Sequence, residues 1–300
     1  MLSSNIDNES VQSRALGAFE TAQALTNAHT PFNIVAILPL RNGPNEETLR
    51  RAIDALQERH PLLRSRLKPV DDGFLFTPTT RPMPLESLER VDDSTWIEVA
   101  ERELGRALDT DFGPLARCLR IAGDGAASEI VLTVHHSIMD ATSGATVVRE
   151  LLTACAAIDA GETPSLGPPL PMMPAEDDLI PDILPGGRRR SNVAGFLLRQ
   201  VADEAAFRIR TIGGRRPPVH QSGNCRILWR RLAEEDTTTL VRACRSHRLP
   251  LNAALNAPML MAVHRQLYDG KATRLRQLNF ADLRQTLKPQ VIEEHIGSYH

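Results

Sequence analysis

The sequence predicts a layered α/β or α+β fold, because segments of strand and helix character alternate irregularly along the chain. Short apolar runs rich in β-branched residues indicate buried strands. Longer stretches with apolar residues three and four positions apart indicate amphipathic helices. The chain has 300 residues, which is more than one minimal core needs and favours two lobes or one large domain.

The first third of the chain carries clear element signals. Residues 32–40 form an apolar run typical of a buried strand. Asn45 is a good N-cap for the helix that follows, and this helix is expected to end at His60, because Pro61 pushes the preceding residue out of the α region. Asp72-Gly73 then predicts a hairpin between strands at 67–70 and 74–77.

A second helix and a strand pair follow. Ser94 is a plausible N-cap for a helix whose apolar face runs from Ile97 to Leu108. Residues 116–121 and 129–136 are predicted as strands around a glycine-containing turn at 123–125. A third helix, whose apolar stripe includes Val147 and Leu151, is expected to stop near Gly161.

Residues 162–187 differ in composition, with seven prolines followed by Gly186-Gly187. This pattern predicts an extended, semi-rigid connection without helix or inner strand. We therefore expect an N-terminal lobe at 1–161, a proline-rich crossover at 162–187 and a further lobe at 188–300. In the last of these, the pattern predicts helices at 192–211, 236–247 and 251–268, and strands at 227–232 and 275–284.

Composition narrows the classes of function. The net charge of −2 and the 4% aromatic content give no case for nucleic-acid binding. The polar N-terminus and the lack of any long apolar run predict a cytoplasmic protein without a transmembrane segment. The cysteines are far apart and form no Cys-x-x-Cys pair, which argues against a zinc site and a disulfide framework and favours small buried side chains. They are Cys118, Cys155, Cys225 and Cys244.

The segment His135-His136-Ser137-Ile138-Met139-Asp140 is the strongest candidate site, and it lies where a predicted strand passes into a loop. Neighbouring residues on a strand point to opposite faces, so His135 and His136 are expected in different surroundings. If the strand runs regularly to its end, His136 shares a face with Ile130, Leu132 and Val134. Imidazole is the side chain best suited to take a proton near neutral pH, which makes His136 a candidate general base.

Other interpretations of these residues stay open. A histidine at a strand end is often structural, and His, His and Asp are also ordinary metal ligands. Opposed side-chain directions make it hard for His135 and His136 to bind one ion, so we expect no metal. Asp140 either orients the loop through a buried ion pair, which we favour, or fixes a histidine tautomer directly.

Several segments, in order, resemble the superfamily of CoA- and carrier-protein-dependent acyltransferases. Residues 134–140 resemble its His-His-x-x-x-Asp (HHxxxD) signature, and 58–64 resemble the end of its first helix. Residues 247–254 resemble a helix start in the second lobe, most like the phthiocerol dimycocerosyl transferase branch. Asp282-Leu283-Arg284 resembles a short motif on the strand that follows. The group also contains the condensation domains of nonribosomal peptide synthetases.

The resemblance implies a two-lobed, chloramphenicol-acetyltransferase-like fold with a tunnel between the lobes. It implies that His136 takes the proton of a hydroxyl or amine acceptor, which attacks an acyl thioester directly. The thioester belongs to acyl-CoA or to a phosphopantetheinyl carrier protein, and no bound cofactor is expected. Asp140 and His135 are implied to be structural. Asp140 is implied to pair with an arginine, for which Arg284 is the first candidate and Arg64 the second.

The chain departs from the family pattern in two ways. Ala141 stands where the family usually has glycine, which puts the shape of the loop in question. The chain also ends at His300, so the second lobe is expected to be incomplete. These departures support an alternative function, a non-catalytic or truncated module that binds a carrier protein or acyl chain. A third interpretation, a metal-dependent hydrolase, predicts loss of activity with a chelator.

Overall fold

The structure is a computed structural model that describes residues 13–123, 127–181, 186–207, 225–268, 275 and 277–299. The chain divides into two compact units. Unit 1 comprises Met1–Ile183, Arg216–Ile227 and Ala281–His300, and unit 2 comprises Leu184–Arg215 and Leu228–Phe280. The predicted lobes at 1–161 and 188–300, with a crossover between them, remain a prediction.

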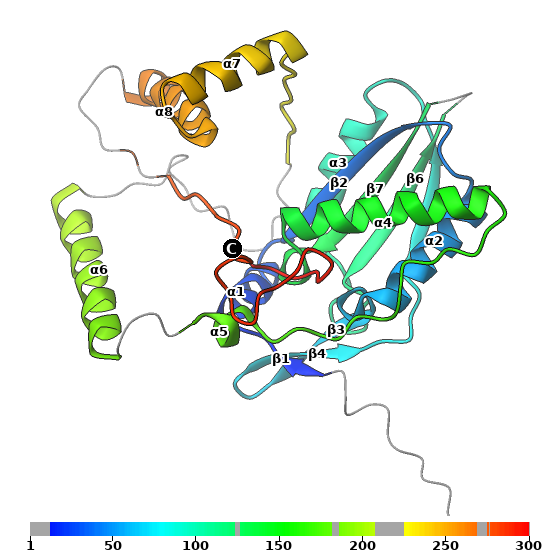
Figure 1. Ribbon diagram of the computed structural model, residues 1–300, viewed down its shortest axis with the longest axis horizontal. Coiled ribbons are helices and arrows are strands. Elements are labelled where there is room, and N and C mark those ends of the chain that lie inside the picture. Colours follow the sequence, from blue (N-terminus) through cyan, green and yellow to red (C-terminus); the bar gives the residue numbers. More distant parts are fainter. Residues whose placement is uncertain are drawn as a thin grey trace, which may run out of the picture. The chain divides into compact units, whose positions relative to one another are not determined.

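Unit 1 is built on a four-stranded sheet with strand order β2-β7-β6-β5 (Figure 1). β7 pairs antiparallel with β2 and with β6, whereas β5 runs parallel to β6. A smaller sheet has the order β1-β4-β3, with antiparallel pairs throughout. The strands are β1 (Arg14–Ala15), β2 (Asn33–Arg41), β3 (Ser65–Val70), β4 (Gly73–Pro78), β5 (Leu85–Glu89), β6 (Ala116–Ala122) and β7 (Ala127–His135).

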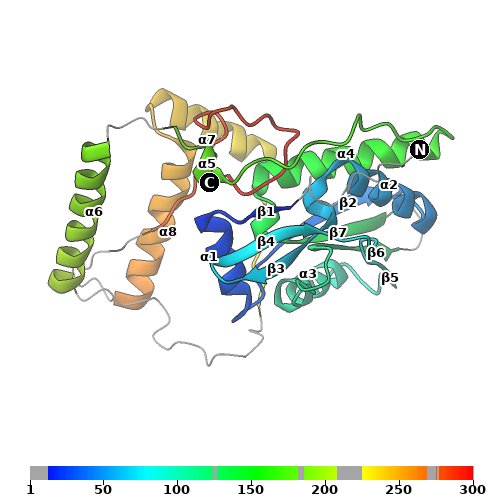
Figure 2. The same cartoon turned by 90° about the horizontal axis from the view of Figure 1, so that it is seen from below.

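Helices cover both faces of the larger sheet, as Figure 2 shows. α2 (Glu46–Arg59) and α4 (Ala141–Asp159) pack on one face, and α3 (Thr95–Gly105) packs on the other. Successive side chains of β7 point to opposite faces of the sheet, as strand geometry requires. Leu132 is buried in the main core beneath α2 and α4, whereas Val131 is buried in a smaller cluster with Val99 of α3.

The local helix signals of the first half are confirmed. The side chain of Asn45 accepts a hydrogen bond from Thr48 N at 2.8 Å and caps α2, and His60 ends that helix in an extended conformation. Ser94 is the N-cap residue of α3, but its side chain makes no capping bond. The predicted hairpin is present as β3 and β4, with Val70 opposite Gly73.

Three of the expected features in residues 162–284 are wrong. The proline-rich segment contains the short helix α5 (Glu176–Leu179), and α6 (Gly186–Phe207) begins inside it. The expected strands at 227–232 and 275–284 are absent from the described residues. A strand is stable only beside another strand, and Leu228 and Leu278 stay more than three-quarters exposed.

Unit 2 contains α6, α7 (Glu234–Ser246) and α8 (Leu251–Tyr268), close to the predicted ranges. Residues 208–211 of the predicted helix 192–211, and residues 124–125 of the predicted turn, lie outside the described residues. Among the described helices, none combines the length and apolarity that crossing a bilayer demands.

The four cysteines are free, and three of them are buried as expected. Cys225 is exposed, which corrects the expectation for that residue. Burial raises the pKa of the Cys118 thiol to about 12 and that of Cys155 to about 11. Thiolate is the nucleophilic form of cysteine, so neither thiol is suited to nucleophilic chemistry near neutral pH.

Candidate active site

The HHxxxD segment, residues 135–140, lies at the end of β7, but the strand stops one residue earlier than predicted. β7 ends at His135, and a 3-10 turn, η2 (His136–Ile138), begins at His136. Alternate residues share a face only within a strand, so this rule does not extend to His136. The expectation that His136 shares a face with Ile130 therefore does not apply. The turn, rather than the strand, sets the direction of the second histidine.

His135 is fully buried and held by the turn that follows it. Its Nδ1 lies 2.7 Å from Ser137 Oγ and 3.2 Å from Ser137 N, which donates to it. An Nδ1 that accepts from a backbone N–H carries no proton, so the neutral ring is protonated on Nε2. Burial, with a smaller contribution from His136, lowers the pKa of His135 to about 4.

His136 is half-buried and is positioned by segments far apart in the sequence. Its Nδ1 lies 3.1 Å from Nε2 of Gln23, a residue of α1 (Ala18–Asn27). The ring stacks on Phe32 with centroids 5.0 Å apart and an interplanar angle of 20°. The backbone N–H of His136 donates to Phe32 O at 3.0 Å, which anchors the turn beside the start of β2.

Asp140 caps α4 and forms a two-pronged ion pair with Arg284. Arg284 Nη1 lies 2.8 Å from Asp140 Oδ2, and Nη2 lies 2.9 Å from Oδ1. Asp140 Oδ1 also accepts from Ser143 N at 2.8 Å, which makes it the N-cap of α4. Burial raises the pKa of Asp140, but the hydrogen bonds from Arg284 and Ser143 outweigh it, so the pKa lies below its usual range. Arg64, the other candidate partner, makes none of these contacts.

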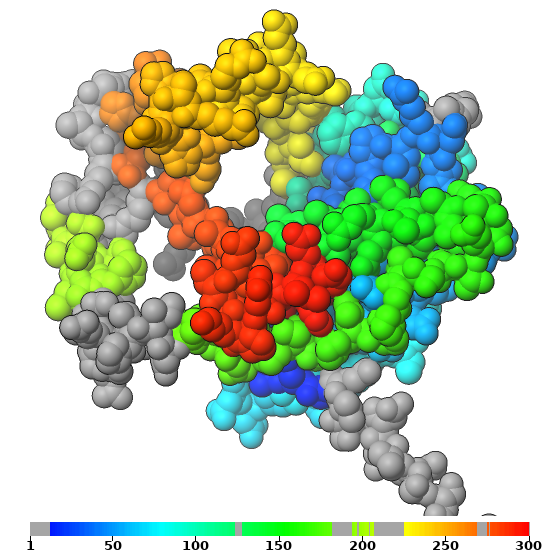
Figure 3. Space-filling model, viewed as in Figure 1, coloured from blue at the N-terminus to red at the C-terminus, as the bar shows by residue number. Residues whose placement is uncertain are grey.

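The segment 293–299 lies against the first turn of α4, as Figure 3 shows in red beside green. Asp140 N donates to Gly297 O at 3.0 Å, and Tyr299 N donates to Asp140 Oδ2 at 3.0 Å. Ser143 Oγ bonds the backbone of Gly297 as well. This segment therefore closes over the HHxxxD segment from a distant part of the sequence.

Ala141 occupies the first position of α4, and its side chain is exposed. The backbone φ of Ala141 is not positive, so this position does not need the conformational freedom of glycine. The substitution of alanine for the family's usual glycine is therefore compatible with this loop.

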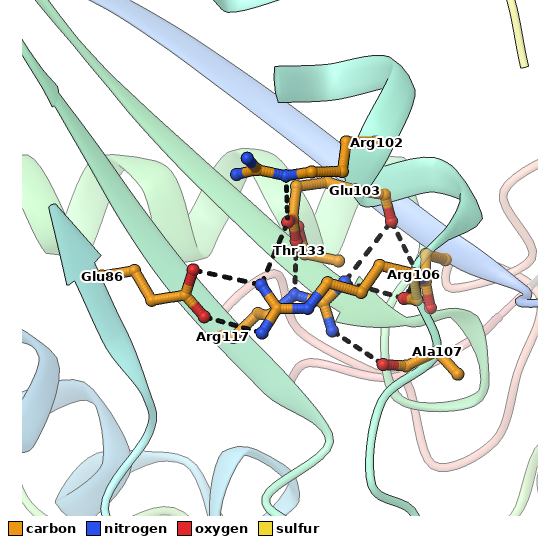
Figure 4. A network of polar contacts seen from close by, with 8 residues as sticks. Glu86, Arg102, Glu103, Arg106, Ala107, Arg117 and Thr133 are labelled. Carbon is orange, nitrogen blue, oxygen red and sulfur yellow. Dashed lines mark hydrogen bonds and ion pairs between the residues drawn. The ribbon is translucent and has the colours of Figure 1, made fainter. Parts of the chain in front are cut away.

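A buried polar network fixes β7 just before the histidines (Figure 4). Glu103 of α3 pairs with Arg117 of β6 and accepts from Thr133 Oγ1 at 3.1 Å. Arg117 also donates to the carbonyls of Ala107 and Arg106, at 2.9 and 2.7 Å. Thr133 lies two residues before His135, so the network fixes the end of β7 against α3.

Several of these residues were not identified from the sequence. Gln23 contacts His136, and Ser298 contacts Gln23, but neither residue belongs to a recognisable motif. Glu103 lies on a predicted helix, and the sequence gives no sign that it bonds Thr133. Within the described residues, no cluster of three or more His, Cys, Asp or Glu has metal-binding geometry.

Comparison with known proteins places this arrangement in a family. The family model for the Condensation domain matches residues 10–171, which cover the larger sheet and the HHxxxD segment, and the chain belongs to the condensation-domain family. Phosphinothricin tripeptide synthetase PhsC of Streptomyces viridochromogenes is 32% identical over 155 residues, which are 48% of this chain and 14% of that protein.

A longer match links the chain to the predicted branch. The phthiocerol/phthiodiolone dimycocerosyl transferase of Mycobacterium leprae is 25% identical over 259 residues, or 85% of this chain and 59% of that protein. Among solved structures, SgcC5 of Streptomyces globisporus aligns with a TM-score of 0.52 and 21% identity, covering 90% of this chain and 60% of that one. The fold class is thereby confirmed, and the chain spans between 14% and 60% of the length of these relatives.

Proposed function

We propose that this chain transfers an acyl group from a CoA or carrier-protein thioester to a hydroxyl or amine, with His136 as the general base. The family supports a transferase in general. The donor, the acceptor and the role of His136 are the proposal.

The placement of His136 is the observation that carries the proposal. Its neighbour His135 is sealed from solvent, and its pKa of about 4 leaves it a weak base. His136 is only partly buried, and Gln23 and Phe32 hold its ring in one orientation. A base positioned in this way contributes roughly 10²–10⁴ in rate.

The proposed reaction transfers one proton and replaces the C–S bond of the thioester with a C–O or C–N bond to the acceptor. His136 takes the proton of the acceptor O–H or N–H as the acceptor atom attacks the thioester carbonyl carbon. The tetrahedral intermediate then collapses, the C–S bond breaks, and the imidazolium of His136 returns the proton to the departing thiolate. The products are an ester or amide and a free thiol, and no acyl-enzyme forms.

The ion pair of Asp140 and Arg284 has a structural part in this proposal. It joins the start of α4 to the segment 281–299, and Asp140, four residues after His136, is also the N-cap of α4. Asp140 touches no atom of His136 in the described contacts. We therefore assign it to holding the turn rather than to proton transfer.

A survey of donors and acceptors tests the proposal. Thiol release is followed for a panel of acyl-CoAs and acyl carrier proteins with mixed alcohol and amine acceptors, and products are identified by mass. Formation of an ester or amide with one equivalent of thiol supports the proposal. Thioester or carrier-protein binding without any product, in folded protein, would instead support the non-catalytic binding module.

A further inference from the structure

The short helix α5 docks on the segment 281–299, which closes over the HHxxxD segment. Leu179 of α5 is 2% exposed and packs in one buried cluster with Tyr299. The backbone N–H of Lys288 donates to Leu179 O at 2.8 Å. The docking of α5 therefore supports the same segment whose Tyr299 N–H bonds the side chain of Asp140.

Glu176 is a buried acid at the start of α5, and it is 8% exposed. Its Oε2 is buried and accepts no hydrogen bond from the described residues. The charges that act on it belong to three other carboxylates, which are Asp177 beside it, Glu20 of α1 and Asp140 at the start of α4. Burial, followed by these like charges, raises the pKa of Glu176 to about 7.

The two arginines of this neighbourhood are paired with carboxylates other than Glu176. Arg14 Nη2 lies 2.6 Å from Glu20 Oε1, and Arg284 Nη1 lies 2.8 Å from Asp140 Oδ2. A charged Glu176 would thus be a buried anion beside like charges, without a hydrogen-bond donor on Oε2. Such an anion is more stable in water, so ionisation of Glu176 opposes the docking of α5.

Tyr299 is another titratable group of this cluster, because the charges of Glu20, Arg284 and Asp140 act on its hydroxyl. Burial raises the pKa of Tyr299 to about 12, so its phenol stays neutral throughout the range in which Glu176 titrates. Of these two buried groups, only Glu176 changes its charge near neutral pH.

We propose that α5 is a proton-dependent latch, in which neutral Glu176 keeps α5 docked on the segment 281–299 and loss of its proton favours release of α5 into solvent. Only the O–H bond of the Glu176 carboxyl breaks, and the proton goes to water. The latch acts on the segment that closes over the HHxxxD segment. It does not depend on the reaction proposed for His136.

Proton linkage determines the pH range of the release. The pKa of Glu176 is about 7 when α5 is docked, against the ordinary 4.5 of a glutamate in water. Between these two values the released form has lost the proton that the docked form retains. The equilibrium constant for release therefore rises by up to about tenfold for each pH unit in this range, and it levels off above it.

Amide hydrogen exchange measures the release directly. The backbone N–H groups of Lys288 and Ile180 report on it, because they donate to Leu179 O and Glu176 O. Their protection factors, corrected for the intrinsic effect of pH on exchange, should fall by roughly thirtyfold to a hundredfold between pH 5 and pH 7.5. The carboxyl ¹³C signal of Glu176, assigned by its loss in Glu176→Gln, should titrate near neutral pH.

Glu176→Gln and Asp178→Asn are a matched pair on α5, because each removes one carboxyl group and only Asp178 is exposed. Glu176→Gln has no proton to lose, so its protection factors should remain high at pH 7.5. Asp178→Asn should keep the wild-type profile. Protection that still falls with pH in Glu176→Gln would overturn the proposal. A flat wild-type profile would overturn it as well, and this test holds even if Glu176→Gln fails to fold.

Discussion

The guanidinium of Arg284 contacts both carboxylate oxygens of Asp140. The two residues lie 144 positions apart in the sequence. Both side chains are buried, and the ring of Tyr299 lies 4.8 Å from the guanidinium carbon. The pair joins the start of α4 to the segment 281–299. The stability of the site therefore depends on a contact between distant parts of the chain.

Removing the charge of Asp140 should destabilise the protein strongly. Asp140→Asn leaves the buried guanidinium of Arg284 without its main partner, and breaking such a pair costs about 3–5 kcal/mol. The native pKa of Asp140 is below its usual range, so this loss should be constant from pH 6 to 8 and diminish only as pH falls below about 4. Urea unfolding at several pH values measures it.

Asp282→Asn is the matched control, because Asp282 also bonds Arg284, at 3.1 Å, but is nearly half exposed. It should cost about 1 kcal/mol or less. Equal losses in the two variants would contradict the role given to the buried pair.

The burial of His135 should make stability depend on pH in the mildly acidic range. The pKa of His135 is about 4 in the folded protein, below the roughly 6.5 of an unfolded chain. Between these values the unfolded chain binds a proton that the folded protein does not, so stability falls as pH falls. Relative to His135→Gln, the wild type should lose about 3 kcal/mol of unfolding free energy between pH 7 and pH 4. A difference that stays flat over that range would show that His135 is not sealed.

The network around Glu103 should be essential for the fold of unit 1. Arg117→Met removes the buried cation that pairs with Glu103, whose side chain is 1% exposed. The carboxylate keeps only longer ion pairs to the more exposed Arg106 and Arg102, at 3.4 and 3.6 Å, so the loss should be up to about 3 kcal/mol. Glu86→Gln breaks a more exposed bond to Arg106 and should cost less than about 1 kcal/mol. Chemical unfolding compares the two, and a mild effect of Arg117→Met would mean that the network does not fix β7.

The parts of the fold that local signals determine could be predicted. Asn45 and Pro61 mark the ends of α2, and the β-branched run before His135 identifies β7, because caps and short-range patterns act within a few residues. Residues 227–232 have the composition of a strand but form none. Whether a strand forms depends on a neighbouring strand, which the local sequence does not reveal.

The candidate site was predictable only in part. The motif identified His136 and Asp140, and the family resemblance pointed to Arg284. Gln23 escaped notice because α1 buries Glu20 and Gln23 beside Ala24, so its inner face is polar and the apolar pattern that reveals a helix is missing. The direction of His136 depended on a turn that starts one residue earlier than strand alternation predicts.

Product formation by the wild type and by His136→Ala, measured side by side with the donor and acceptor found in the survey, tests the central claim most directly. Both proteins are first shown to be folded by matching unfolding curves. The account predicts ester or amide and free thiol from the wild type, and a loss of at least about 10²-fold in the variant. A folded His136→Ala that forms product at the wild-type rate would contradict the assignment of His136 as the general base.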